Sequence, residues 1–265
     1  MTSRIGKLIV FAAAAVAASS IGVPLRGQTR SPAKADAPAP VVLVELFTSE
    51  GCSDCPPADT LLRQIDGKRT PEGQLIVGIS EHVTYWDRLG WKDPFSSELF
   101  TGRQEEYGQR FGLDSVYTPQ IVVNGREQLV GSDGRSLATA FAMEARRSQI
   151  NLRLQSAHFL SDHMEFRYSA DGMPAGDKVQ LFAVVVDDLD QSDVTRGENS
   201  GRNLTHAAVA RALFPLGTLL PTPGRNVSVP VPSSIEADLS RGHHLIVFAQ
   251  QFGGGAVLGV DTCPI

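Results

Sequence analysis

The chain has 265 residues, of which 42% are hydrophobic and 20% are charged, a balance typical of folded domains and not of disordered or collagen-like chains. Its net charge of -5 provides no basic surface, so we expect no nucleic acid among its partners. Composition and charge point to no particular activity, and the function has to be inferred from local motifs.

Residues 1–18 have the pattern of a signal peptide. Arg4 and Lys7 supply the positive charges, and a short apolar run (LIVFAAAAVAA) fills residues 8–18. This run is shorter than the roughly 20 residues that span a bilayer, so cleavage is favoured over a membrane anchor. We therefore predict a periplasmic or secreted protein with no stable membrane insertion after cleavage.

Residues 19–40 are rich in Pro, Ala and Gly. Such a segment cannot bury enough apolar surface to offset the entropy lost on ordering, so we predict a flexible linker before a folded part. Export also matters for the three cysteines, Cys52, Cys55 and Cys263, because disulfides persist outside the cytosol. Three cysteines are too few for a disulfide scaffold, and the odd number leaves one thiol over.

Residues 41–149 alternate between strand and helix patterns. The expected elements are a strand at 41–47, a helix at 57–66, a strand at 74–80, a helix at 97–111, a hairpin at 117–131 that turns at Asn124-Gly125, and a helix from Asp133 to about 148. The initial order of strand, helix and strand implies a parallel pair with a crossover. We therefore predict an α/β domain over these residues.

Residues 150–265 have a different pattern, with almost no helical periodicity. Short strand candidates are separated by Asp-Gly, Pro-Gly and Gly-rich breaks. The candidates are INLRLQSAHFL, HMEFRYSA, KVQLFAVVVDD, NVSVPVPS and HHLIVFAQQF. This pattern predicts an all-β, antiparallel β-sandwich-like domain that follows the α/β domain.

The CxxC pair at Cys52 and Cys55 stands between the first expected strand and the first expected helix. The free N–H groups and positive dipole end of a helix stabilise a thiolate and lower the pKa of the first cysteine. Cys52 is therefore the expected nucleophile, and Cys55 the expected resolving thiol that closes the disulfide and releases a mixed-disulfide partner.

Several sequence blocks resemble those of a secreted thioredoxin-like family, catalogued as domain of unknown function 1223 (DUF1223). The blocks are ELFTSEGCSDCPPAD, EHVTYWDRLGWKDPF, RQEEY, VYTPQIVVNG and GENSGRNLTH. The resemblance implies a thioredoxin-like fold for residues 41–149, with Pro119 in the cis form against the CxxC. It also implies that the main chain at Thr118-Pro119 binds the substrate strand, but the family carries no established activity.

Asp54 lies inside the CxxC motif, where ordinary thioredoxins have no acidic residue. A carboxylate this close disfavours a neighbouring thiolate and opposes the helix dipole. A less stable reduced form makes the disulfide harder to reduce, so Asp54 is expected to tune the pair toward a reductant.

The CxxC pair has two other interpretations. A structural disulfide would also persist outside the cytosol, although it closes a very small loop and constrains the unfolded chain little. A structural zinc site normally needs four ligands, which one CxxC does not supply. Cu(I) needs fewer ligands, and Cys52, Cys55 and His82 are a candidate set for it.

The loop after the second expected strand, residues 81–95, is placed to approach the cysteines, because sites form at the carboxyl ends of strands in α/β sheets. His82 is a candidate proton shuttle or ligand. Trp86 and Asp87 belong to the same candidate lid, for which simple packing is the alternative, since aromatic residues usually supply burial.

Residues 196–214 contain Gly197 and Gly201 in a polar loop before an apolar stretch. The spacing and the lysine of a Walker phosphate loop are absent, so a hairpin turn that faces the α/β domain is favoured over a phosphate site. Cys263 is the third residue from the end, where it is either a bystander on a mobile tail or a partner of the CxxC in a redox latch.

Together these patterns predict an exported thiol–disulfide oxidoreductase that acts through Cys52 and Cys55. Its partners would be thiols or disulfides of other exported proteins and a redox partner that recycles the pair. No organic cofactor is expected, because the electrons pass through sulfur alone. The alternatives are a Cu(I) delivery module, which is not an enzyme, and an interaction protein in which the disulfide is structural.

Overall fold

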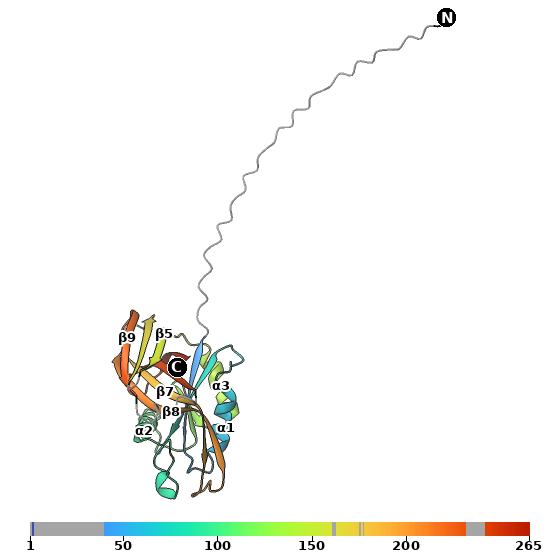
Figure 1. Ribbon diagram of the computed structural model, residues 1–265, viewed down its shortest axis with the longest axis vertical. Coiled ribbons are helices and arrows are strands. Elements are labelled where there is room, and N and C mark those ends of the chain that lie inside the picture. The colour runs from blue at the N-terminus through green and yellow to red at the C-terminus, as the bar shows by residue number, and fades with distance from the viewer. Residues whose placement is uncertain (1, 3–39, 161–162, 175, 177, 232–241) are drawn as a thin grey trace. The chain divides into compact units, whose positions relative to one another are not determined.

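The computed structural model describes residue 2 and residues 40–160, 163–174, 176, 178–231 and 242–265. The predicted signal peptide and linker, residues 1–18 and 19–40, lie almost wholly outside the described residues. From Pro40 onward the described residues belong to one compact unit (Figure 1). Among the described helices, none is both long and apolar enough to cross a membrane.

Strands outnumber helices along the described chain. The elements, in order, are β1 (Val41–Thr48), α1 (Pro56–Ile65), β2 (Leu75–His82), the short 3-10 helix η1 (Asp87–Leu89), α2 (Glu98–Phe111), β3 (Gln120–Val123), β4 (Glu127–Val130), α3 (Gly134–Glu144), β5 (Asn151–Phe159), β6 (His163–Asp171), β7 (Val179–Asp193), β8 (Asn203–Thr218), β9 (Thr222–Pro230), β10 (His243–Gln251) and β11 (Val257–Pro264). The predicted order of local elements in residues 41–149 is confirmed.

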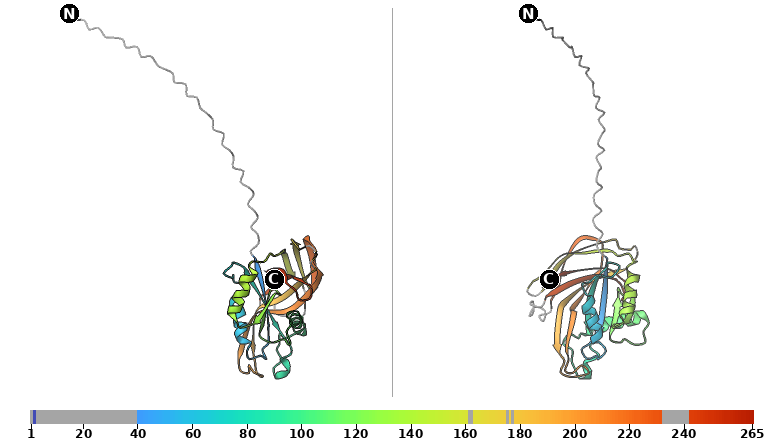
Figure 2. Two further views of the ribbon diagram at one scale, coloured as in Figure 1. Left: turned by 180° about the vertical axis from the view of Figure 1, so that it is seen from behind. Right: turned by 90° about the vertical axis from the view of Figure 1, so that its right-hand side faces the viewer.

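The described strands form two sheets. Eight strands make a mixed sheet in the order β11-β10-β7-β8-β2-β1-β3-β4, and the other three make a sheet in the order β5-β6-β9. In the large sheet β1 and β2 are parallel, and β2 joins β8 in parallel through a single residue pair, Ser80 with Val209. Helices α1 and α3 lie on one face of this sheet and α2 lies on the other (Figures 1 and 2).

Strand β1 is buried along its whole length, because both of its faces are covered. Val44 and Leu46 pack with Leu62 of α1 and with residues of α3. Leu43 points to the opposite face, where it packs in the same core as Phe100 of α2. The β1 strand therefore ends, and delivers the CxxC, in the middle of a fully packed sheet.

The predicted fold class, an α/β thioredoxin-like domain followed by an all-β domain, is wrong. The structure is mostly β, and β7, β8, β10 and β11 continue the same sheet as β1–β4. Both halves share one hydrophobic core, in which Ile79 of β2 packs with Val184 of β7 and Phe248 of β10. An unpaired edge on a strand as buried as β2 would leave main-chain groups unsatisfied, and pairing with β8 removes part of that edge.

A buried charge cluster also connects the two halves. Arg103 of α2 donates from Nε to Oε1 of Glu45 on β1 at 2.6 Å, and from a terminal nitrogen to Oε1 of Gln250 on β10 at 3.1 Å. Burial and the charge of Glu45 raise the pKa of the Glu81 carboxyl well above its ordinary value, despite the nearby guanidinium. Arg103 thus compensates buried carboxylates of the first half, and Gln250 of the second half accepts one of its remaining hydrogen bonds.

Candidate functional site at the Cys52–Cys55 disulfide

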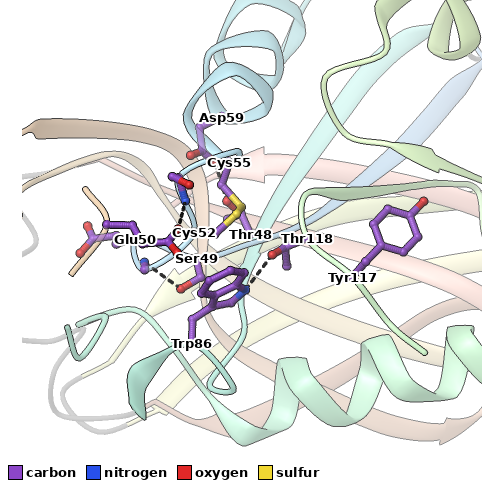
Figure 3. The surroundings of a disulfide bond; sticks show 12 residues. Thr48, Ser49, Glu50, Cys52, Cys55, Asp59, Trp86, Tyr117 and Thr118 are labelled. Carbon is purple, nitrogen blue, oxygen red and sulfur yellow. Dashed lines mark hydrogen bonds between the residues drawn. A yellow bond between two sulfur atoms is a disulfide. The ribbon is translucent and has the colours of Figure 1, made fainter. Parts of the chain in front are cut away.

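Cys52 and Cys55 form a disulfide between the end of β1 and the start of α1 (Figure 3). Cys55 is the residue before the helix, and its carbonyl accepts from the N–H groups of Ala58 and Asp59 at 2.9 and 3.1 Å. Prolines occupy the first helical positions, where no N–H is needed. The predicted succession of strand, CxxC and helix is therefore confirmed.

Both sulfur-bearing side chains are buried, with 1% of Cys52 and none of Cys55 exposed. Trp86 lies over the turn before the pair, since a Cβ added to Gly51 would come within 2.9 Å of the Cβ of Trp86. Because Cys52 is buried, disulfide exchange at its sulfur requires a segment that covers it to move.

The third cysteine, Cys263, is a free thiol in β11. Its backbone pairs with Leu245, so it does not lie on a mobile tail.

The Thr118–Pro119 peptide bond is cis, as the family resemblance implied. A Cβ added to Gly131 would lie 2.9 Å from the Cβ of Pro119 and 3.0 Å from that of Ala58, so this proline and the first turn of α1 flank the same glycine. The hydroxyl of Thr118 accepts from Nε1 of Trp86 at 2.8 Å, beside the disulfide (Figure 3). Thr118, Pro119 and Trp86 are thus at the site.

The described side-chain hydrogen bonds of His82 and Asp87 are made within the loop and not to the CxxC. The His82 ring, fully buried at the end of β2, pairs through Nδ1 with Oδ2 of Asp93 at 2.7 Å. Asp87 accepts from the N–H of Asp93 and from the hydroxyl of Ser96, which organises the loop. Across the described residues, no group of three or more His, Cys, Asp or Glu side chains has a metal-binding arrangement, so the Cu(I) set is not preformed.

The sequence did not reveal a buried acid–base cluster behind the disulfide. Nε2 of His206, on β8, lies 3.4 Å from Oε1 of Glu50, and its Nδ1 lies 3.6 Å from Oδ2 of Asp59. Asp59 is one helical turn after Cys55 and accepts from the hydroxyl of Thr48 at 2.8 Å. Burial alone would lower the pKa of His206, but the two carboxylates outweigh it and raise the pKa to about 10.

Glu50 is held in place from several sides. Its Oε2 accepts from Nε1 of Trp91 at 2.7 Å and from the hydroxyl of Ser192 on β7 at 3.0 Å. Its backbone N–H donates to Oδ2 of Asp93 at 2.8 Å, the same oxygen that pairs with His82. The ring centroids of His82 and His206 are 4.7 Å apart, so the pair of His82 and Asp93 packs directly against the cluster.

The tip of the β7–β8 hairpin, residues 194–202, covers the CxxC from the other side. The side-chain Nδ2 of Asn199 donates to the carbonyl oxygens of Glu50 and Cys52, both at 2.9 Å. The N–H of Ser53 donates to Oε2 of Glu198 at 3.1 Å. The predicted hairpin turn that faces the first half of the chain is therefore confirmed, and its contact is the CxxC itself.

These missed residues were visible in the sequence only as parts of two blocks. Glu50 and Asp59 belong to the CxxC block, whereas Asn199 and His206 belong to the block GENSGRNLTH. No local period links blocks so far apart, and only the pairing of β8 with β2 brings them together. Asp54, the predicted tuning residue, is exposed beside the pair.

The fold and the site define a mostly β protein with a disulfide at the start of a helix that packs on a mixed sheet. The chain belongs to the family described as protein of unknown function (DUF1223), which it matches over residues 43–250. None of the curated proteins matches the sequence closely enough to count as a relative.

Among solved structures, the chain is similar to protein AGR_C_4864 from Agrobacterium tumefaciens, a structural genomics target. The two are 28% identical with a TM-score of 0.62, and the match covers 85% of this chain and 95% of that one. A β-glucosidase from Kluyveromyces marxianus shares 13% identity with a TM-score of 0.22, over 44% of this chain and 14% of that chain, which is too little to support an argument. The comparisons thus establish the family.

Proposed function

We propose that the protein is an exported thiol–disulfide oxidoreductase that exchanges disulfides with other exported proteins through Cys52 and Cys55. The observation that carries the proposal is the position of the disulfide at the start of α1, beside Thr118 and Pro119. Export rests on the signal-peptide pattern of residues 1–18. The local resemblance to the thioredoxin superfamily is part of the proposal and supports it, although the sheet as a whole is different.

The exchange proceeds in two displacement steps. A thiolate of the partner attacks Sγ of Cys52, the bond between the two cysteines breaks, and Cys55 leaves as a thiolate that takes up a proton. A second thiolate of the partner then attacks its own sulfur in the mixed disulfide and releases Cys52. The partner's dithiol loses two electrons, and the CxxC pair gains them with two protons; the reverse sequence reduces a partner disulfide.

The helix and the buried cluster have separate roles in these steps. The N-terminus of α1 stabilises negative charge on Cys52 once the disulfide opens. The imidazolium of His206, held by Asp59 and Glu50, supplies positive charge at the helical turn that follows Cys55, and the proton that the Cys55 thiolate takes up comes from solvent once the site has opened. Asp59 follows Cys55 by one turn of the helix and lies next to it in Figure 3.

Substrate selection involves the residues beside the pair. In this proposal the main chain at Thr118-Pro119 presents the substrate strand, and Trp86 closes the side of the site by its hydrogen bond to Thr118. Asp54 adds negative charge next to the pair, which disfavours the Cys52 thiolate and makes the couple a reductant. No organic cofactor takes part.

The proposal is tested by trapping mixed disulfides in the cell that exports the protein. Cys55→Ser cannot resolve a mixed disulfide, so it should accumulate covalent adducts with exported proteins that reducing agents release. The variant with both Cys52→Ser and Cys55→Ser is the matched control and should form none. Equal adduct levels in the two variants would show that any adducts come from Cys263 and would overturn the proposal.

One observation favours a second candidate, an interaction protein with a structural disulfide. Cys52 and Cys55 are almost completely buried, as structural disulfides commonly are, and four described hydrogen bonds fix the CxxC turn from other segments. In that case Cys52→Ser lowers stability and has no other effect. The two candidates therefore differ in whether the sulfur of Cys52 ever becomes accessible.

A further inference from the structure

The hairpin tip, residues 194–202, is a short polar loop anchored on the CxxC turn. It closes through hydrogen bonds from the N–H of Val194 to the carbonyl of Arg202 at 3.0 Å, and from the N–H of Gly201 to the carbonyl of Val194 at 2.7 Å. Gly197 and Gly201 have positive φ angles of 76° and 81°, which glycine adopts without a steric penalty. Most of the tip is exposed, whereas Asn199 is fully buried. Asn199 is thus the buried side chain that anchors the tip on the CxxC turn, and Gly197 lies close to Trp91.

The Asn199 amide has a defined orientation. A terminal nitrogen of Arg202 donates to its Oδ1 at 2.9 Å, which leaves Nδ2 to donate to the carbonyl oxygens of Glu50 and Cys52. Glu198 completes the contact as an acceptor for the N–H of Ser53. The tip therefore presents two N–H donors and one oxygen acceptor to the main chain of the CxxC turn.

This is the pattern of hydrogen-bonding groups that a peptide main chain offers. An extended polypeptide also carries N–H donors and carbonyl acceptors at the spacing of neighbouring residues. We infer that the hairpin tip is a gate over the disulfide, and that an extended segment of the substrate protein replaces Asn199 and Glu198 at the main chain of the CxxC turn. The inference rests on the proposed function and adds how the site opens and what it binds.

The gate also affects the chemistry of Cys52. The carboxylate of Glu198 accepts a hydrogen bond from the N–H of Ser53. This donor, next to Cys52, would otherwise be free to stabilise a thiolate. Hydrogen bonds from Ser53 keep the pKa of Glu198 below its ordinary value, so the carboxylate remains charged. The closed gate therefore covers the disulfide and places a negative charge beside Cys52, and a neutral peptide carbonyl in place of Glu198 removes that charge.

The first test measures the rate at which dithiothreitol reduces the disulfide of the full-length protein. Asn199→Ala and Glu198→Ala should each raise the rate by about tenfold, because each removes hydrogen bonds that hold the gate closed. Arg196→Ala is the matched control, since this exposed tip residue makes no hydrogen bond to the CxxC turn in the described structure. Rates within a factor of about two of the wild type in both variants would overturn the gate.

The unfolding temperature of each variant is a second readout, which distinguishes an opened gate from a loss of stability. Glu198 is exposed, so Glu198→Ala should unfold at the wild-type temperature while it still speeds reduction. If only Asn199→Ala reacts faster, and only in proportion to a loss of stability, local unfolding explains the result and the gate is overturned.

The substrate part of the inference has its own probe. Two peptides, each with one cysteine, are allowed to react with the disulfide of the Asn199→Ala variant. The unmodified peptide should exchange faster than the peptide whose amides beside the cysteine are N-methylated. Equal rates for the two peptides would overturn main-chain binding. Failure of the proposed function is distinguishable, because it appears as an absence of Cys55→Ser adducts in the cell whatever these rates are.

Discussion

Nδ1 of His206 lies 3.6 Å from Oδ2 of Asp59, and both side chains are buried, so an ion pair lies inside the protein next to the disulfide. The partners come from β8 and α1, which belong to opposite halves of the sequence. An ion pair between such distant segments couples the electrostatics of the CxxC helix to the second half of the chain. It also makes the stability of the protein depend on pH.

Stability should fall as the pH rises above neutrality. The pKa of His206 is raised from 6.5 to about 10 in the folded protein, so the stabilisation from its charge is fully present below pH 6.5 and is lost as the pH rises toward 10. Urea unfolding across this range should show a loss of a few kcal/mol in the wild type. His206→Gln should be less stable at neutral pH and should lose little more on going to pH 10.

His158→Gln serves as the control for this titration, because His158 is exposed and lies on β5. It should follow the wild-type curve. A His206→Gln protein with the same slope as the wild type would show that another group titrates, and the assignment to His206 would be withdrawn.

Reduction of the disulfide should cost little stability. A disulfide that closes so small a loop constrains the unfolded chain only slightly, and about 2 kcal/mol is the expected loss. Cys52→Ser with Cys55→Ser, compared with the oxidised wild type by urea unfolding, measures it. A much larger loss would favour the structural interpretation of the pair over redox chemistry.

Trp86 should hold the loop over the site through Thr118. Trp86→Phe keeps an aromatic ring but removes the Nε1 donor, so it should lower the free energy of unfolding by about 1 kcal/mol. Thr118→Val removes the acceptor and should cost a similar amount, whereas the matched control Thr118→Ser retains the hydroxyl and should cost less. If Thr118→Ser and Thr118→Val are equally destabilised, a change in packing at this position and not the loss of the hydrogen bond is responsible.

The two halves of the chain should unfold together. Arg103→Met leaves Glu45 buried without its cation, and the expected loss is about 3–5 kcal/mol. Tryptophan fluorescence, which reports on the first half, and far-ultraviolet circular dichroism should give the same midpoint. Arg135→Met, a change at an exposed arginine of α3, should leave the midpoint unchanged. Two separate transitions in the wild type would contradict a shared core.

Asp54 should make the disulfide harder to reduce. Asp54→Asn removes a negative charge beside the pair, and equilibration with a glutathione redox buffer should show a reduced form favoured by up to about fivefold more than in the wild type. Glu72→Gln, an exposed change outside the CxxC turn, controls for net charge. A shift in the opposite direction would mean that the carboxylate acts through another group.

The local elements of the first half follow from sequence patterns alone. The short apolar run at 74–80, the Asn124-Gly125 turn and the cysteines before a helix are each specified within a few residues, and the structure has them where they are expected. Such patterns depend on neighbouring residues and on the periods of strand and helix. They cannot show which strand pairs with the free edge of β2.

That pairing decided both the fold and the site. Joining β8 to β2 through Ser80 and Val209 merges two expected domains into one sheet, and the same step brings His206 and the hairpin tip to the disulfide. The energy of this arrangement comes from apolar surface shared between distant segments, which leaves no periodic trace in either of them.

By itself, therefore, the sequence determined the CxxC at a strand–helix junction, the hairpin after Pro119 and the family resemblance. Only the tertiary structure decided that the pair is buried, that His206 stands between Glu50 and Asp59, and that Asn199 bonds the carbonyl of Cys52. The physical reason is that local periodicity encodes backbone conformation, whereas burial and charge pairing depend on contacts between segments far apart in the chain.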